Sequence, residues 1–158
     1  MHVSTRLKAA LAATAAVLLV VVSIAGAAGT LRVSTAQNAT LHKRILVTTS
    51  GRTLYSLSAE THGRFICTHA CLSTWPPLVL KHGAKPVGVR GLSSIRRPDG
   101  RRQVTYKGKP LYRFSGDTKK GDVGGEGFRD VGTWHAAAAP RSGSSHSPAP
   151  APSPLPGY

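Results

Sequence analysis

An imperfect internal repeat is the feature that most constrains the fold of this chain. The ten residues from Gly51 to Glu60 can be placed over the ten from Gly108 to Asp117, because their residue numbers differ by 57 throughout. A tryptophan follows each copy at a similar distance, at Trp75 and Trp134. Two upstream pairs keep the same spacing: Val47 with Val104 and Thr48 with Thr105. One structural unit has therefore been used twice.

Each copy has the residue pattern of a β-hairpin. The strand, turn and strand segments are 45–49, 50–51 and 53–57 in the first copy, and 103–106, 107–108 and 111–114 in the second. Pro110 can open its strand because a first position need not donate to the ladder. A further strand is expected at 92–96, before the turn sequence Pro98-Asp99-Gly100. With no helical period outside the N-terminal segment, we expect a mainly β fold: a single small antiparallel β domain built from two related hairpin repeats.

The N-terminal residues have the order of an export signal. Arg6 and Lys8 precede an unbroken apolar stretch, Ala9–Ala28, that contains small residues at its end. The stretch is also long enough to cross a bilayer as a helix, so cleavage and retention as an anchor are both open. The rest of the chain is expected outside the cytoplasm, secreted or held at the membrane.

The remaining sequence divides by composition. Pro, Ser, Ala and Gly dominate the C-terminal end, which predicts a disordered tail. The expected organisation is a signal peptide or membrane anchor at 1–28, a linker at 29–39, the β repeat domain at 40–139 and the tail at 140–158. Within the domain, repeat one is expected at about 44–79 and repeat two at about 101–136.

The chain is strongly basic. It has 21 Lys and Arg against 6 Asp and Glu, and it keeps an expected net charge of +13 when Arg6 and Lys8 leave with the signal. This charge favours contact with polyanions, here anionic envelope polymers or lipid headgroups. The cations are not interleaved with aromatic residues in a patch, so no specific nucleic acid is expected. A solvated basic surface is the favoured interpretation, and a binding role is the alternative.

Aromatic and acidic residues recur in the repeat. Alternation sends Tyr55 with Leu57, and Tyr112 with Phe114, to one face of each unit. We expect these residues, with Trp75 and Trp134, to form a shared core, the alternative being an exposed binding platform. The acids that end the two copies, Glu60 and Asp117, are expected to accept hydrogen bonds that fix turns, the alternatives being metal ligation and catalysis.

These motifs together resemble a family of bacterial exported lipoproteins described as a secreted repeat of unknown function, which carries a Tyr-x-aromatic-x-x-Asp motif. The motif is read from Tyr112 through Phe114 to Asp117, and most of 46–134 is similar to the family. The resemblance implies a cell-envelope repeat protein without an established activity. The first copy departs from the motif with Leu57 and Glu60, and the cysteine that would carry a lipid is absent.

Cys67 and Cys71 are the only cysteines. In an oxidising compartment they most simply form one disulfide across a loop, which is expected to be non-helical because Pro76 and Pro77 follow. The alternatives are a metal or haem contact that includes His69, or thiol redox chemistry. These alternatives define a second functional hypothesis, an extracytoplasmic redox or metal-handling protein.

The loop after the second copy holds four acids among glycines. Asp117, Asp122, Glu126 and Asp130 could offer oxygen ligands to calcium, although the order differs from an EF-hand and Lys119 and Lys120 oppose a concentrated negative charge. An ion-paired turn region is the favoured interpretation, so no metal and no cofactor are expected, with Asp117, Asp122, Glu126 and His69 as the metal candidates.

Enzyme signatures are missing from the sequence. It has no nucleophile elbow, no zinc-protease helix and no phosphate-cradling loop. Glu60 and Asp117 could form a carboxylate pair if the repeats packed about a twofold axis. The favoured hypothesis is a non-catalytic, exported envelope protein, with no catalytic residue and an oligomeric state that the sequence leaves open.

Overall fold

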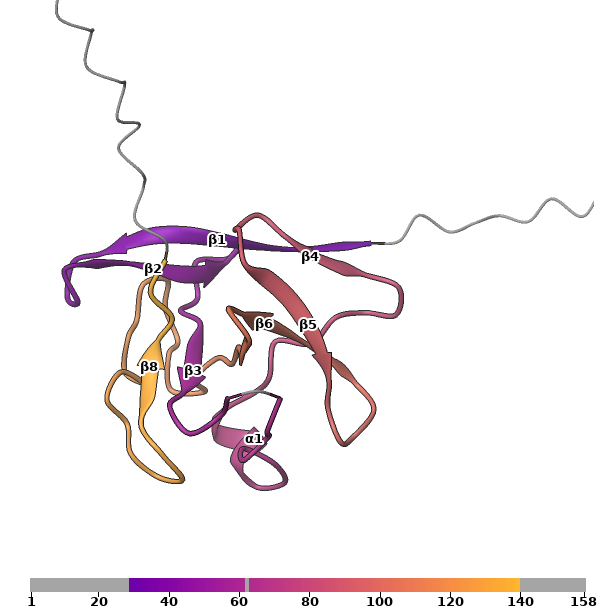
Figure 1. Ribbon diagram of the computed structural model, residues 1–158. Coiled ribbons are helices and arrows are strands. Elements are labelled where there is room, and N and C mark those ends of the chain that lie inside the picture. Colours follow the sequence, from indigo (N-terminus) through magenta and orange to yellow (C-terminus); the bar gives the residue numbers. More distant parts are fainter. Residues whose placement is uncertain (1–28, 62, 140–158) are drawn as a thin grey trace, which may run out of the picture.

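The computed structural model describes residues 29–61 and 63–139, and this part of the chain is mainly β, as predicted (Figure 1). The expected export segment and C-terminal tail lie outside the described residues. The elements are β1 (Thr30–Asn38), β2 (Lys43–Thr48), β3 (Tyr55–Leu57), α1 (Cys71–Thr74), β4 (Lys85–Val87), β5 (Leu92–Arg96), β6 (Arg102–Tyr106), β7 (Lys109–Pro110) and β8 (Trp134–Ala136).

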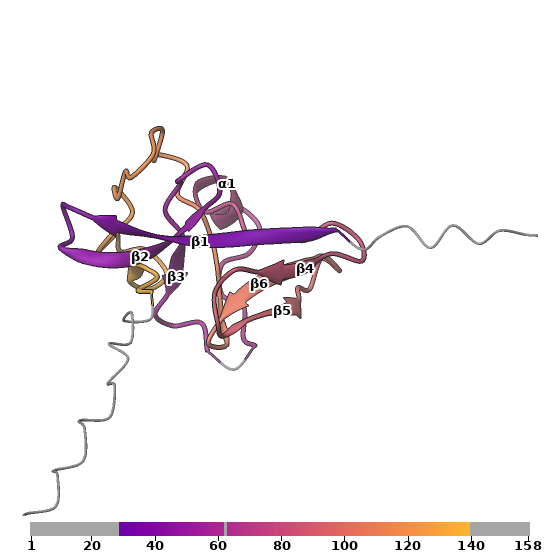
Figure 2. The same cartoon turned by 90° about the horizontal axis from the view of Figure 1, so that it is seen from above.

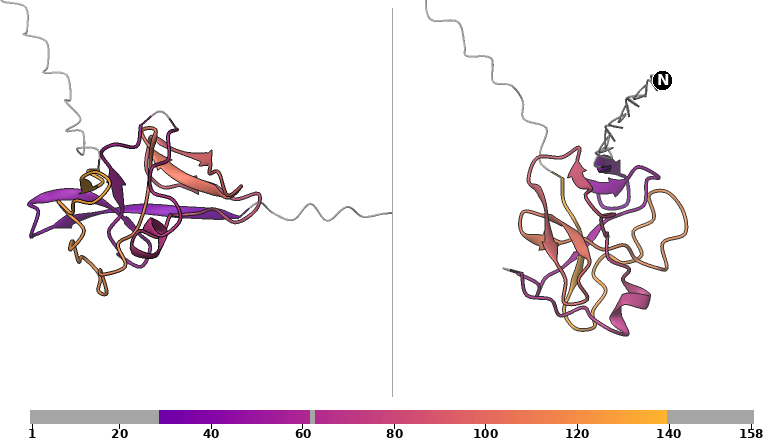
Figure 3. Two further views of the ribbon diagram at one scale, coloured as in Figure 1. Left: turned by 90° about the horizontal axis from the view of Figure 1, so that it is seen from below. Right: turned by 90° about the vertical axis from the view of Figure 1, so that its right-hand side faces the viewer.

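The strands form three small sheets with the orders β2-β1-β4, β3-β8 and β5-β6-β7. The long strand β1 lies across one end of the domain, with β2 beside one half and β4 beside the other (Figure 2). The short helix α1 lies at the end away from β1 (Figure 3). All strand pairs are antiparallel except β1 with β4, so the expectation of a purely antiparallel domain is corrected at this pair.

The two copies of the repeat are joined by an antiparallel bridge between Tyr55 and Tyr112. The N–H of each tyrosine donates to the carbonyl of the other, at 2.9 Å in both directions. Because these residues occupy the same position in the two copies, the bridge lies on an internal twofold axis. Neither hairpin is a separate lobe.

Hydrogen bonds on the two sides of this axis correspond to one another. Leu46 N–H donates to Ala137 O at 2.8 Å, and Val104 N–H donates to Leu78 O at the same distance. Likewise Ser58 N–H donates to Thr133 O and Ser115 N–H to Thr74 O, both at 2.9 Å. Each copy therefore pairs with the segment around the tryptophan of the other copy, which makes the two halves one continuous β arrangement.

The register of the repeat changes at the hairpin turn. In the second copy Thr105 pairs with Pro110 around the two-residue turn Lys107-Gly108, whose φ angles of 49° and 78° are both positive. In the first copy Val47 pairs with Thr53 across a turn that is one residue longer. Val47 is therefore structurally equivalent to Thr105, and the sequence pairing of Val47 with Val104 is one residue out of step.

The boundaries of the domain extend beyond the predicted ones. The expected linker at 29–39 contains β1, which pairs with β2 in the same way that β5 pairs with β6. The segment TLRVSTAQN has only one half-apolar face, so its sequence gives little indication of a strand. Each repeat is thus a three-stranded unit, and the second one begins at β5.

Buried side chains form two clusters along the twofold axis. One is aliphatic and is centred on Leu46, Leu54, Val104 and Leu111. The other is aromatic and contains Tyr55, Trp75, Tyr112 and Trp134, all with no exposed surface, while Phe114 packs against it from a half-buried position. Both clusters draw on both copies, so neither repeat completes a buried cluster by itself.

The single helix of the described part is one turn long. It ends at Thr74 because Pro76 and Pro77 cannot continue it. Among residues 29–61 and 63–139, no helix is long and apolar enough to cross a membrane.

Gly125 provides a test of the aromatic packing. A β-carbon at this position would lie 2.7 Å from the indole ring of Trp75 and 3.0 Å from the ring of Tyr55. We expect Gly125→Ala to lower the free energy of unfolding by about 1–3 kcal/mol, because the ring stack cannot move aside without losing its contacts. Urea unfolding measures the change. Gly29→Ala, where no atom lies within 4 Å, is the control, and equal stability of the two variants would contradict the packing.

Candidate functional site

Two tyrosine–carboxylate pairs cross the twofold axis. The Tyr55 hydroxyl donates to Asp117 Oδ2 at 2.6 Å, and the Tyr112 hydroxyl donates to Glu60 Oε2 at 2.8 Å. Each tyrosine thus binds the acid of the other copy, and all four side chains are buried. We call these four residues the crossed centre. It explains why the repeat ends in an acid: the carboxylate is the acceptor for the tyrosine of the partner copy.

The second oxygen of each acid closes a loop. Glu60 Oε1 accepts the N–H groups of Ile66 and Cys67 at 2.7 and 2.8 Å, and Asp117 Oδ1 accepts the N–H of Gly124 at 2.9 Å. Gly124 and Cys67 lie 57 residues apart, so the two bonds are equivalent. Both acids accept hydrogen bonds in turns, which is the arrangement expected for a structural role.

Sequence reasoning missed Arg97, which is 3% exposed. Its guanidinium donates to Gln103 Oε1, to the Tyr112 hydroxyl at 3.2 Å and to Cys67 O at 3.0 Å, and it lies 4.7 Å from the centre of the Phe65 ring. This cation contacts the Tyr112–Glu60 pair through the tyrosine hydroxyl, and its ion pair is with Asp99. Nothing in the sequence distinguishes it from the many exposed arginines.

Asn38 takes the equivalent place in the first copy. It ends β1 as Arg97 follows β5, it is 6% exposed, and its Nδ2 donates to Gly121 O at 2.9 Å. Each residue therefore ties the first strand of one repeat to the loop of the other. Asn38 can be identified only by its position equivalent to that of Arg97, and this equivalence is visible only when the pairing register of β1 is known.

The tryptophans stack on each other across the axis. Their ring centres lie 3.8 Å apart with an angle of 8° between the planes. Tyr55 packs edge-on against Trp75, and Tyr112 packs edge-on against Trp134. Trp134 Nε1 donates to Asp130 Oδ1 at 2.9 Å, whereas Trp75 Nε1 has no partner within the described residues. The residue four positions before Trp75 is Cys71, so a cysteine stands where the second copy has Asp130.

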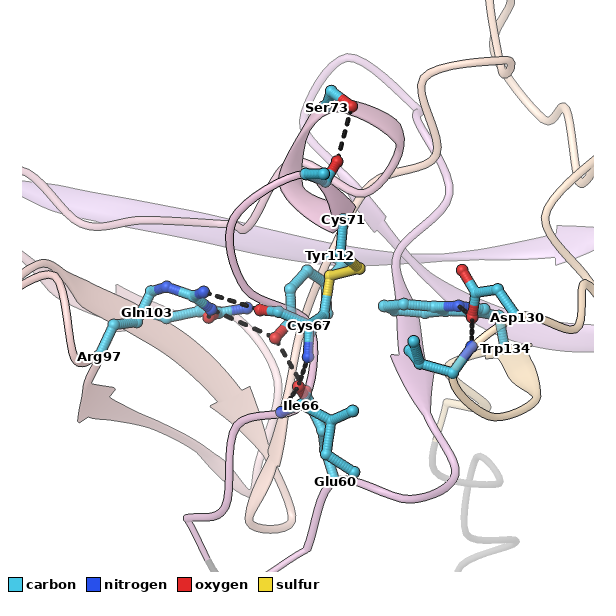
Figure 4. The surroundings of a disulfide bond; sticks show 12 residues. Glu60, Ile66, Cys67, Cys71, Ser73, Arg97, Gln103, Tyr112, Asp130 and Trp134 are labelled. Carbon is cyan, nitrogen blue, oxygen red and sulfur yellow. Dashed lines mark hydrogen bonds between the residues drawn. A yellow bond between two sulfur atoms is a disulfide. The ribbon is translucent and has the colours of Figure 1, made fainter.

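The predicted Cys67–Cys71 disulfide is confirmed, with the two Cα atoms 5.3 Å apart (Figure 4). Cys67 is fully buried beside Arg97 and Tyr112, and Cys71 begins α1. The expectation of a non-helical loop is therefore wrong for Cys71. The two sulfur atoms are bonded to each other. His69, between them in the sequence, is exposed, and its backbone φ angle is 49°. Metal or redox chemistry at this loop stays a prediction.

The acids of the loop after the second copy bind different partners and do not converge on one site. Asp122 Oδ2 accepts the N–H groups of Thr118 and Lys119, and Glu126 accepts the N–H of Ala136 and pairs with Lys43 and His135. Partial burial opposes ionisation of Glu126, but these partners outweigh it and lower the pKa of its carboxyl group. In the part of the chain that the structure describes, no three His, Cys, Asp or Glu side chains gather in a way that could hold a metal ion.

The crossed centre has the chemistry of an internal clamp. Burial, reinforced by the adjacent carboxylate, raises the pKa of both Tyr55 and Tyr112 well above the usual value. The phenols are therefore neutral donors at physiological pH. Each carboxylate already accepts two or three hydrogen bonds, so the centre stabilises the contact between the repeats.

Comparison with known proteins connects this architecture to one family. Residues 93–138 match a family described as a secreted repeat of unknown function. The match confirms the resemblance over the second repeat, from β5 to just beyond β8, and the resemblance of the first copy stays a prediction. The family description supports an extracytoplasmic location. No match was found among curated proteins or among solved structures.

Two buried tyrosines test the energetic role of the crossed centre. Tyr112→Phe leaves Glu60 without its hydroxyl donor, and we expect the free energy of unfolding to fall by about 1–3 kcal/mol. Tyr106→Phe is the matched control, because the hydroxyl of Tyr106 is buried without a partner in the described chain. Its removal is expected to be neutral or stabilising. Similar losses in the two variants, measured by urea unfolding, would show that the Tyr112 bond contributes nothing specific.

The raised tyrosine pKa values also predict sensitivity to alkali. The unfolded chain releases a phenolic proton near pH 10, whereas the folded chain retains the protons of Tyr55 and Tyr112. Their contribution to stability is complete below about pH 10 and is lost as the pH rises further. We expect the unfolding free energy of the parent to fall more steeply between pH 9 and 11 than that of Tyr112→Phe. Parallel pH profiles would contradict this assignment.

Proposed function

We propose that this protein is a non-catalytic component of the bacterial cell envelope that binds anionic polymers or lipid headgroups through its basic surface. It acts outside the cytoplasm, either released or held at the membrane by its N-terminal segment. The description of the matched family as secreted supports the location. The distribution of charge within the fold supports the binding role.

The observation that carries the proposal is that most acids accept hydrogen bonds from uncharged donors within the domain. Glu60 and Asp117 bind tyrosines and backbone N–H groups, Asp122 binds backbone N–H groups, and Asp130 binds the Trp134 indole. Only Asp99 and Glu126 make ion pairs within the described residues. Four of the six negative charges are thus used for internal structure.

Most cations consequently have no carboxylate partner. Of the 21 Lys and Arg residues, Arg6, Lys8 and Arg141 lie outside the described part, which leaves 18. Among these, ion pairs are made by Lys43, Arg97 and Arg101. The other 15 have none within residues 29–61 and 63–139, and such an excess attracts polyanions over a distance of about one Debye length.

The crossed centre supports the non-catalytic part of the proposal. A glycosidase would need Glu60 and Asp117 as free carboxyl groups on either side of a sugar. Both are buried, and each is bonded to a different tyrosine. They are therefore committed to holding the repeats together.

The test is binding of the full chain to a glycerol-phosphate polymer and to vesicles with and without phosphatidylglycerol, over a range of NaCl concentrations. We expect retention on the anionic probes to exceed retention on neutral vesicles and a neutral glucan, and to weaken about tenfold or more between 50 and 300 mM salt. Comparison with neutral vesicles removes any contribution from apolar insertion of the N-terminal segment. Equal retention on charged and neutral probes, or a salt-insensitive difference, would overturn the proposal.

A further inference from the structure

We infer that a cleft between β4, β5 and the start of β6 binds the phosphate groups of anionic phospholipids, and that the domain faces the membrane with the side at which its chain enters. This inference rests on the proposed function and assigns it to one site. The cleft has a volume of about 510 Å³. Its walls come from the segment 80–86, Ser94 and the segment 100–102, and we call it the entry cleft.

The entry cleft is lined by cations and by no acid. Lys81 and Lys85 lie on one wall, and Arg101 and Arg102 lie on the other. Arg101 and Arg97 both pair with Asp99. The hydrogen bonds from Arg101 lower the pKa of the Asp99 carboxyl group, so Asp99 stays charged and offsets one cation. Lys81, Lys85 and Arg102 make no ion pair in the described chain. Three uncompensated positive charges therefore face one concave space.

Neighbouring groups hold the side chain of Arg102 and the backbone of Lys85 in position. The Arg102 guanidinium donates through Nε and Nη2 to the Ser94 hydroxyl of the adjacent strand, and this orients the planar group. Lys85 belongs to β4, and its N–H donates to Gly29 O at 3.0 Å. Lys85 and Arg102 are thus placed by strands β4 and β6, Lys81 lies in the loop before β4, and a phosphate would meet donors from two walls of the cleft.

The location of the entry cleft points to a lipid as the source of the phosphate. Thr30 pairs with Lys85, so the chain enters the domain at the edge of the cleft, at the right-hand end of β1 in Figure 1. The sequence immediately before this point is the apolar stretch Ala9–Ala28. A chain held in a bilayer by that stretch would bring this side of the domain to the headgroups first.

A second cleft beside the first has the composition of an interfacial surface. It has a volume of about 600 Å³, shares Lys81, His82 and Ala84 with the entry cleft, and adds apolar walls from Leu31 and Val79. Cations next to an apolar hollow match the boundary between phosphate groups and acyl chains. A phospholipid would contact both the cations and the apolar walls, whereas a soluble polyanion would contact the cations alone.

The test is amine labelling of the full chain followed by mass spectrometry, with vesicles of phosphatidylcholine alone or with added phosphatidylglycerol. We expect labelling of Lys81 and Lys85 to fall by about threefold or more with phosphatidylglycerol, and to recover in high salt, because bound phosphates shield the amines. Labelling of Lys119 and Lys120, on the loop after the second copy, is expected to change little. A glycerol-phosphate polymer is the parallel arm.

Two charge-matched variants accompany the labelling. The triple variant Lys81→Gln, Lys85→Gln and Arg102→Gln removes three unpaired cations of the entry cleft, and the variant Arg64→Gln, Lys119→Gln and Arg129→Gln removes three elsewhere. We expect the first to lose about tenfold or more of the preference for phosphatidylglycerol vesicles, and the second to lose much less. Thermal unfolding confirms that both variants fold.

The outcomes separate the two proposals. Protection of Lys81 and Lys85 by the polymer alone would show that the entry cleft binds wall polymer and would overturn the lipid assignment. Uniform protection of all lysines, or equal losses in the two variants, would show diffuse attraction and overturn the site while leaving the proposed function intact. Absence of any preference for anionic probes would overturn both.

Discussion

The hydrogen bonds that cross the twofold axis are the interaction on which the rest of the structure depends. Tyr55 and Tyr112 bond to each other through their backbones and to Asp117 and Glu60 through their hydroxyls, so each repeat supplies a donor that only the other can accept. The stacked tryptophans lie next to these pairs, and the loops that hold the tryptophans are closed by the same two acids. The same tyrosines and acids therefore support the aromatic core, close the two loops and join the repeats across the twofold axis.

Much of the fold followed from the repeat, and the limits of prediction lie where the copies differ. Strong alternation and turn residues located both hairpins, β5 and its turn, and the proximity of two cysteines located the disulfide. The sequence predicts a linker where β1 lies because the exposed residues of this strand hide its alternation, and the extra residue in the first turn displaces the predicted register. Neither feature can be recognised without the partner strand.

The sequence predicts most of the residues that form the site, but it does not predict which of them bond to each other. The tyrosines, acids and tryptophans were all named from the repeat, since their types and spacing recur. That each tyrosine bonds to the acid of the other copy depends on how two units pack, which one sequence does not encode locally. Arg97 and Asn38 were missed for the same reason: their residue types differ, and only the strand register shows that they occupy equivalent positions.

The sequence separation of the crossed pairs has a consequence for how the protein reaches its native state. The partners Tyr55 and Asp117 are 62 residues apart, and Tyr112 and Glu60 are 52 apart. In a chain that crosses a membrane N-terminus first, the first repeat would emerge without the acceptor of Tyr55 and without the second tryptophan. Contacts of this range form late and slowly, since a long loop must close before they are made. In such a chain the crossed centre closes only after Asp117 has followed the first repeat, so completion of the domain is a late step.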